Sequence, residues 1–145
     1  MEGAGVSAHG RDCTRPVELL DLYPTLAEIC QLEGTPGKLH GRSLLPLLNN
    51  PSAPWDKPAI SQVRRVSPKG PVMGYSLRTE RYRYSNWEQG GAGEELYDYQ
   101  ADPREIRNMA LDESMSSLKK QLRSQLLAIT RQRGMTAQPA TGNGL

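Results

Sequence analysis

Four side chains of the kinds that act as nucleophiles, bases or soft metal ligands lie in the first 40 residues: His9, Cys13, Cys30 and His40. They lack the short paired spacings of a zinc site. Nothing in the sequence joins either histidine to a nucleophile and an orienting acid, as a hydrolytic triad requires. We therefore predict no catalytic residue and no metal ligand in this chain.

The two cysteines do not form a C-x-x-C pair. Cys30 falls on the apolar face of a predicted helix, which favours a buried free thiol. A disulfide between Cys13 and Cys30 stays open, because spacing alone does not decide it.

A basic and aromatic cluster occupies the middle of the chain, with arginines and tyrosines interleaved: Tyr75, Arg78, Arg81, Tyr82, Arg83 and Tyr84. Such interleaving occurs on surfaces that stack nucleic-acid bases, but strict alternation is equally typical of a half-exposed hairpin. The chain carries 18 Lys and Arg against 16 Asp and Glu, a formal net charge of +2. That balance gives no strong positive field, so we favour the hairpin and expect no nucleic-acid partner.

The apolar content is low for a chain of this length. Leu, Ile, Val and Phe together supply 27 of 145 residues, and the mean hydropathy is −0.63. The small net charge argues for a globular chain with a thin core, or for one that docks on another surface. No apolar run is long enough to span a membrane, so no membrane partner is expected. The N-terminus lacks the apolar region of a signal peptide.

The first half of the chain predicts mostly helix and loop. Asp21 is placed to cap a helix over residues 21–32, and Pro24 fits its first turn. Leu22, Leu26, Ile29 and Cys30 then share one face. The other expected elements are a flexible lead over 1–14, a strand over 17–20, a Ser43-capped helix over 44–48 and a proline-rich loop over 51–57.

The second half predicts an antiparallel sheet and a long helix. Strands are expected over 59–66, 72–78, 81–87 and 95–99, with a tight hairpin between the second and third. Asp112 starts a helix that runs to Arg133, whose Leu118, Leu122 and Leu126 are predicted to be buried under it. A disordered tail is expected over 134–145. The fold class is thus α+β: a small antiparallel sheet with a C-terminal helix packed on it.

Four phrases give the chain a family resemblance: PVELLDLYPTLAEICQL (16–32), GRSLLPLL (41–48), VMGYSLRTERYRYSNW (72–87) and EELYDYQADPREIRN (94–108). In this order they resemble the C-terminal portion of sulfatases of the alkaline phosphatase superfamily, most of all iduronate-2-sulfatase and its bacterial relatives. The resemblance implies that residues 15–57 are the tail end of the sulfatase α/β domain, to which the first helix would belong. Residues 58–133 would be its C-terminal subdomain.

The resemblance also implies a chemistry whose motif is not found here. Such sulfatases are metal-dependent hydrolases of sulfuric esters; they use calcium and a formylglycine made from the Cys or Ser of C/S-x-P-x-R. Residues 13–16 (CTRP) have Arg and Pro at the wrong offsets, and residues 52–56 (SAPWD) have Asp where Arg is required. A cap and a turn explain Asp98 and Asp102 better than metal binding does. We therefore interpret the chain as a fragment that is inactive alone and needs no cofactor of its own.

On this interpretation the partner is the N-terminal sulfatase domain, against whose mixed sheet residues 21–31 would pack. Self-association through Leu22, Leu26 and Ile29 is the expected consequence when that domain is absent. The resemblance suggests Arg83 and Trp87 as substrate-binding residues, because a guanidinium and a flat ring suit anionic sugars. A plain packing face of the hairpin is the competing interpretation of the same two residues.

A non-enzymatic interaction module is the alternative function for the whole chain. An upstream reading frame that encodes C/S-x-P-x-R would favour the fragment. The family is usually periplasmic, secreted or lysosomal, but this chain does not indicate its own compartment.

Overall fold

The chain is organised in two units, divided between Ala59 and Ile60. The computed structural model describes residues 5–68 and 70–135. In this described part no helix has both the length and the apolar character to cross a bilayer. The predicted tail lies outside it from residue 136 on, as do the first four residues of the predicted lead.

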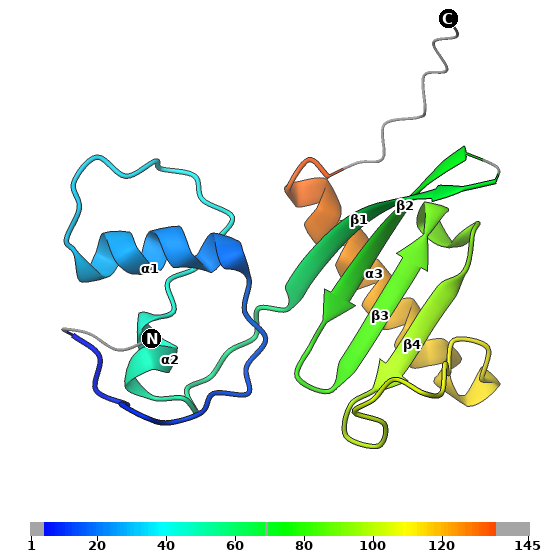
Figure 1. The fold of residues 1–145 in the computed structure, drawn as a ribbon, viewed down its shortest axis with the longest axis horizontal. Helices are drawn as coiled ribbons and strands as arrows, with labels where there is room; N and C mark the ends of the chain where they lie inside the picture. Colours follow the sequence, from blue (N-terminus) through cyan, green and yellow to red (C-terminus); the bar gives the residue numbers. More distant parts are fainter. Residues whose placement is uncertain (1–4, 69, 136–145) are drawn as a thin grey trace, which may run out of the picture. The chain divides into compact units, whose positions relative to one another are not determined.

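The first unit contains a 3-10 turn and two helices (Figure 1). The turn is Leu19–Asp21, α1 is Leu22–Ile29 and α2 is Leu45–Asn49. The strand predicted over 17–20 is wrong, because the Asp21 Oδ2 atom accepts a hydrogen bond from the Glu18 backbone N–H at 2.9 Å and closes the turn instead. Asp21 therefore precedes α1 without capping it through its side chain. Pro24 lies in the first turn of α1, as predicted.

The lead over 1–14 was expected to be flexible, but residues 6–8 are bound to the rest of the first unit. Val6 is buried, the Ser7 N–H donates to the Asn49 side-chain carbonyl at 3.0 Å, and the Ala8 N–H donates to Leu48 O at 3.2 Å. Isolated hydrogen bonds to the end of α2 hold this segment. Such bonds need no periodic pattern of side chains, so the sequence carried no sign of them. Ser43 Oγ accepts from the Leu45 N–H at 3.2 Å, but α2 begins one residue later than expected and its N-cap residue is Leu44, so Ser43 precedes the cap position.

Helix α1 turns its apolar face outward within this unit. Leu22 and Leu26 are 39% and 49% exposed, and the buried side of the helix consists of Thr25 and Ala27. The prediction of a buried Cys30 is wrong: α1 ends one residue earlier, and both cysteines are exposed free thiols. The disulfide between Cys13 and Cys30, which the sequence left undecided, is not formed in this structure.

The second unit confirms the predicted sheet. Its strands are β1 (Ala59–Ser67), β2 (Gly70–Arg78), β3 (Tyr82–Trp87) and β4 (Glu94–Asp98). They lie in the order β1-β2-β3-β4, and β3 pairs antiparallel with both β2 and β4. A short 3-10 turn, Glu88–Gly90, follows β3.

Helix α3 (Ser116–Gln132) lies across one face of this sheet (Figure 1). A 3-10 turn, Glu113–Met115, leads into it, and Asp112 caps that turn by accepting the Ser114 N–H at 3.0 Å. Leu122 and Leu126 are 3% and 1% exposed, whereas Leu118 is only partly buried at the edge of the core. The buried core between helix and sheet consists of Tyr75, Leu77, Tyr84, Leu96, Ala110, Leu122 and Leu126.

Candidate functional site

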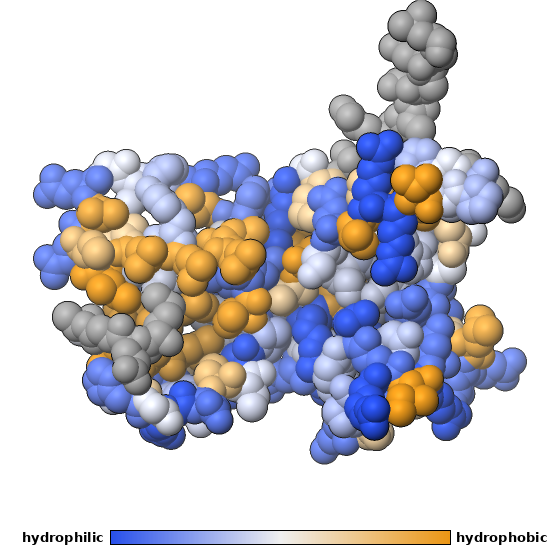
Figure 2. Space-filling model, in the orientation of Figure 1, coloured by the Kyte–Doolittle hydropathy of each residue, from blue (hydrophilic) through white to orange (hydrophobic). Residues whose placement is uncertain are grey.

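The sheet of the second unit has one face under α3 and one open face. In the β2–β3 register, Gly74 lies opposite Trp87, Ser76 opposite Ser85, and Arg78 opposite Arg83. These side chains alternate with the core residues, so they belong to the face away from α3. Figure 1 shows α3 behind the sheet and no helix of this unit in front of it, and Figure 2 shows that this face is mostly hydrophilic. We call it the open face.

Trp87 packs flat against the sheet at its position on the open face. A Cβ atom built on Gly74 would lie 2.5 Å from the Trp87 ring, which only glycine avoids. The Arg65 guanidinium lies 4.5 Å from the ring centroid, a cation–π distance. Trp87 is therefore a fixed aromatic surface held between a glycine and an arginine.

Arg83 and Arg78 form a second group on the same face. The Arg83 Nη1 atom lies 2.8 Å from the Glu105 Oε1 atom, and its guanidinium is 5.9 Å from the Tyr97 ring centroid. The Arg78 guanidinium lies 3.2 Å from the centroid of the Tyr99 ring. Burial lowers the pKa of Arg78, while Tyr99 and Glu105 act in the opposite direction.

The structure thus places the two predicted residues on one face and one strand but in separate groups. Arg83 belongs with Glu105 and Trp87 with Gly74. Sequence reasoning placed Arg78 in the basic and aromatic cluster but did not select it as a substrate-binding residue, although the tight turn after it fixes the register that sets it opposite Arg83. It also missed Tyr99 and Glu105, which follow β4 and carry no periodic signal.

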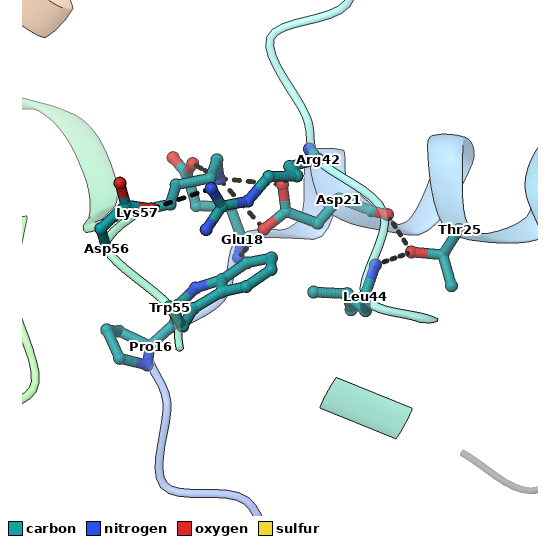
Figure 3. A network of polar contacts seen from close by, with 9 residues as sticks. All are labelled: Pro16, Glu18, Asp21, Thr25, Arg42, Leu44, Trp55, Asp56 and Lys57. Atoms are coloured by element: carbon teal, nitrogen blue, oxygen red, sulfur yellow. Dashed lines mark hydrogen bonds and ion pairs between the residues drawn. The ribbon is translucent and has the colours of Figure 1, made fainter. Parts of the chain in front are cut away.

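A buried ionic network organises the first unit (Figure 3). The Lys57 ammonium makes an ion pair with Glu18 and lies 2.8 Å from Asp21 Oδ1. The Asp21 side chain is fully buried and also accepts the Arg42 backbone N–H at 2.8 Å. Thr25 Oγ1 continues the network by accepting the Leu44 N–H at 2.8 Å. These bonds fasten three distant segments together, so we assign the network to structure.

Trp55 and Arg42 extend this network towards solvent. The Arg42 guanidinium lies 3.9 Å from the Trp55 ring centroid and 2.8 Å from Asp56. That hydrogen bond from Arg42 holds the pKa of Asp56 below its usual range. The Trp55 indole N–H donates to Pro16 O at 3.0 Å. Figure 3 shows the Trp55 ring lying beside the ion pairs.

The two segments with nucleophile-like sequences, 13–16 and 52–56, are neighbours in space. Cys13 Sγ is 3.4 Å from Pro51 O, and Arg15 Nη2 is 3.4 Å from Ser52 O. Both contacts go to backbone carbonyls and neither activates a nucleophile.

The side chains of Asp98 and Asp102 are committed to protein partners. Asp98 receives three hydrogen bonds from the Arg81 guanidinium and one from the Gln100 N–H, and Asp102 accepts the Arg107 N–H at 2.8 Å. Among the described residues no group of three or more His, Cys, Asp or Glu side chains converges to hold a metal. This part of the chain does not fit the metal centre of a sulfatase.

Comparisons with known proteins agree in pointing to one family. Residues 5–132 match the family model for the C-terminal region of N-sulphoglucosamine sulphohydrolase. The chain is 33% identical over 100 residues to a Δ4,5-hexuronate-2-O-sulfatase of Bacteroides thetaiotaomicron. It is 30% identical over 128 residues to an arylsulfatase K of Xenopus laevis. The solved structure of a 2-O GAG sulfatase superposes on 91% of the chain with a TM-score of 0.77 and 27% identity.

The match covers only part of each relative. The alignments include 68% and 79% of this chain but 20% of the hexuronate sulfatase and 23% of the arylsulfatase K. The solved sulfatase is covered over 29% of its own length. The match to a C-terminal family model, spanning both units, confirms the resemblance found in the four phrases. The chain belongs to the N-sulphoglucosamine sulphohydrolase C-terminal family and is similar to part of several sulfatases.

Proposed function

We propose that this chain serves as the C-terminal subdomain of a sulfatase that hydrolyses sulfate esters on a sulfated uronic sugar. The observation that carries the proposal is the continuous match of both units to 2-O-sulfatases and to the C-terminal family model. The described residues supply neither a formylglycine motif nor a metal cluster, so the reacting groups belong to the catalytic part of the enzyme.

Family membership implies a divalent metal and a formylglycine in the complete enzyme. We propose calcium as that metal and place both groups outside this chain. The two aspartates considered as metal ligands in this chain already have other partners: Asp98 binds Arg81, and Asp102 closes a turn. The contribution of this chain is thus to shape and support the enzyme, with no bond-making step of its own.

The partner in this proposal is the catalytic α/β domain of the sulfatase. Most of the large exposed apolar side chains of the described residues belong to the first unit: Val17, Leu19, Leu20, Leu22, Tyr23, Leu26, Leu32 and Leu39. Figure 2 shows a broad orange area over this unit. A contiguous apolar area of this kind marks an interface. Without the catalytic domain, the same face would drive self-association through Leu22, Leu26 and Ile29.

The substrate-facing part of the chain in this proposal is the open face with Arg83 and Trp87. Trp87 is fixed over Gly74, and its ring, together with the Arg65 guanidinium 4.5 Å from the ring centroid, presents an aromatic and cationic group to an anionic sugar. Arg83 is 36% exposed at its side chain and keeps donors available for an anionic group. Packing of the open face against another domain is the competing role.

A chimera tests the proposed function. The C-terminal part of the Bacteroides hexuronate-2-O-sulfatase that matches this chain is deleted in one variant of that enzyme and replaced by this chain in another. We expect the deletion to abolish hydrolysis of a 2-O-sulfated unsaturated disaccharide and the replacement to restore it. A folded, soluble chimera with no activity, or a deletion variant that keeps full activity, would contradict the proposal. The same assay on this chain alone, with and without calcium, should stay at background.

A further inference from the structure

Two arginines face each other across neighbouring strands on the open face. The β2–β3 register sets Arg78 directly opposite Arg83. Like charges in that position repel each other and destabilise a hairpin. Only one carboxylate, Glu105, forms an ion pair with either of them in the described residues. The group of three therefore keeps a net charge of +1.

Neighbouring side chains hold the two guanidinium groups in fixed positions. The Tyr99 ring lies 3.2 Å from the Arg78 guanidinium, and the Tyr99 hydroxyl donates to the Glu105 carboxylate, which pairs with Arg83. Glu105 itself has a φ of 55°, a left-handed conformation that is rare for a residue with a side chain. The Glu105 N–H is bonded to Asp102 O at 3.2 Å, so this backbone conformation is held by the turn. Both arginines are thus preorganised.

Each guanidinium leaves one buried nitrogen without an acceptor. Within the part of the chain that the structure describes, Arg78 Nη1 and Arg83 Nε are buried and have no hydrogen-bond partner. Buried donors are almost always paired in folded proteins. Two unpaired donors on facing arginines mark a place where an acceptor is expected, and an oxyanion with several oxygens can satisfy both.

We propose that Arg78 and Arg83 form a binding site for an oxyanion, a sulfate or a carboxylate carried by the sugar substrate. The guanidinium fork matches the planar edge of such a group and binds it through two parallel hydrogen bonds. Glu105 and Tyr99 are positioning residues: Glu105 holds Arg83 through the ion pair, and Tyr99 holds Arg78 through its ring. The sugar as carrier rests on the proposed function, whereas the oxyanion site does not.

The test measures binding to the full chain by NMR, from the backbone amide signals of β2 and β3 and the arginine Nε–H signals. Inorganic sulfate is titrated against sodium chloride at equal ionic strength, because screening alone shifts exposed charges. We expect sulfate to give saturable shifts in both strands. Arg78→Gln and Arg83→Gln should each weaken binding about tenfold or more, since each removes half of the donors. Arg104→Gln removes an exposed arginine outside the group and should leave binding unchanged.

Conservative variants guard against misfolding. Arg78→Lys and Arg83→Lys keep the charge and lose the fork, and we expect them to weaken binding several-fold while the amide spectrum of the core stays unchanged. An absence of saturable shifts in the unaltered chain would overturn the site. Equal weakening by Arg104→Gln would do the same, because it would show attraction by net charge alone.

A second set of probes identifies the carrier. A 2-O-sulfated unsaturated uronic disaccharide is compared with its desulfated form and with its carboxyl methyl ester. Loss of binding on desulfation assigns the site to the sulfate, and loss on esterification assigns it to the carboxylate. If inorganic sulfate binds and the disaccharide does not bind more tightly, the oxyanion site stands and the sugar assignment is wrong.

Discussion

Replacing Lys57 by Met should lower the free energy of unfolding of the first unit, because the Glu18 and Asp21 carboxylates then stay buried without their cation. The Asp21 side chain is fully buried, and that of Glu18 is 5% exposed. Removing one member of a buried ionic group costs about 3–5 kcal/mol in general. Asp21 keeps its bonds from the Glu18 and Arg42 backbone N–H groups, so we expect about 3 kcal/mol.

The assay is urea unfolding followed by the fluorescence of Trp55, which belongs to the same network. Trp87→Phe in all variants leaves Trp55 as the single tryptophan. A unit of this size has a denaturant slope of about 1 kcal/mol per molar urea, so the midpoint should fall by roughly 3 M. Lys38→Met makes the same change at an exposed lysine and should alter stability by less than about 0.5 kcal/mol.

A double variant separates charge from packing. Adding Glu18→Gln to Lys57→Met removes one of the stranded charges and should recover at least about 1 kcal/mol. A cost of less than about 1 kcal/mol for Lys57→Met would refute the stranded-charge explanation, and so would a further loss of stability when Glu18→Gln is added.

Three further outcomes are expected. Leu122→Ala and Leu126→Ala should each lower the free energy of unfolding of the second unit by about 2–5 kcal/mol by circular dichroism; equal effects from Leu111→Ala, at a 93% exposed leucine, would contradict this. Leu22→Glu with Leu26→Glu should convert associating chains to monomers by sedimentation velocity, and an unaltered chain that is already monomeric would refute the exposed interface. The hydrogen bond from Arg81 holds the pKa of Asp98 below its usual value of about 4, so this pair stabilises the fold above that pH and the effect is lost as pH falls through the lowered pKa. Asp98→Asn should flatten the acid limb of the stability curve measured by thermal unfolding, and an unchanged limb would exclude this contribution.

The second unit could be predicted well because its patterns are periodic. Tyr82 and Tyr84 alternate with Arg83 as a strand with one buried face requires, and Leu118, Leu122 and Leu126 repeat at helical spacing. Side-chain periodicity reports burial directly, so the sheet and α3 follow from it.

The first unit could be predicted less well because side-chain hydrogen bonds decide its shape. Asp21 was expected to cap α1, but its carboxylate oxygens instead bind the Glu18 N–H, the Arg42 N–H and the Lys57 ammonium. Such partners are distant in sequence and leave no local signal. Cys30 was expected to be buried because it shares the apolar face of α1, yet that face points outward in this unit.

The candidate site was predicted in part for the same reason. Arg83 and Trp87 could be placed on one face from strand alternation alone. Glu105 could not be placed beside Arg83, because a left-handed turn after β4 brings it there. Arg78 needed the hairpin register, which only the turn at Thr79 sets.

The nucleotide sequence upstream of this chain tests the central claim most directly. If the chain works as the C-terminal subdomain of a sulfatase, a reading frame in the same direction encodes C/S-x-P-x-R together with the paired aspartates of a metal site. Its product, made with this chain, should hydrolyse the 2-O-sulfated disaccharide. An upstream region that encodes no sulfatase sequence, beside a chain that is stable and monomeric alone, would contradict this role and support a separate interaction module.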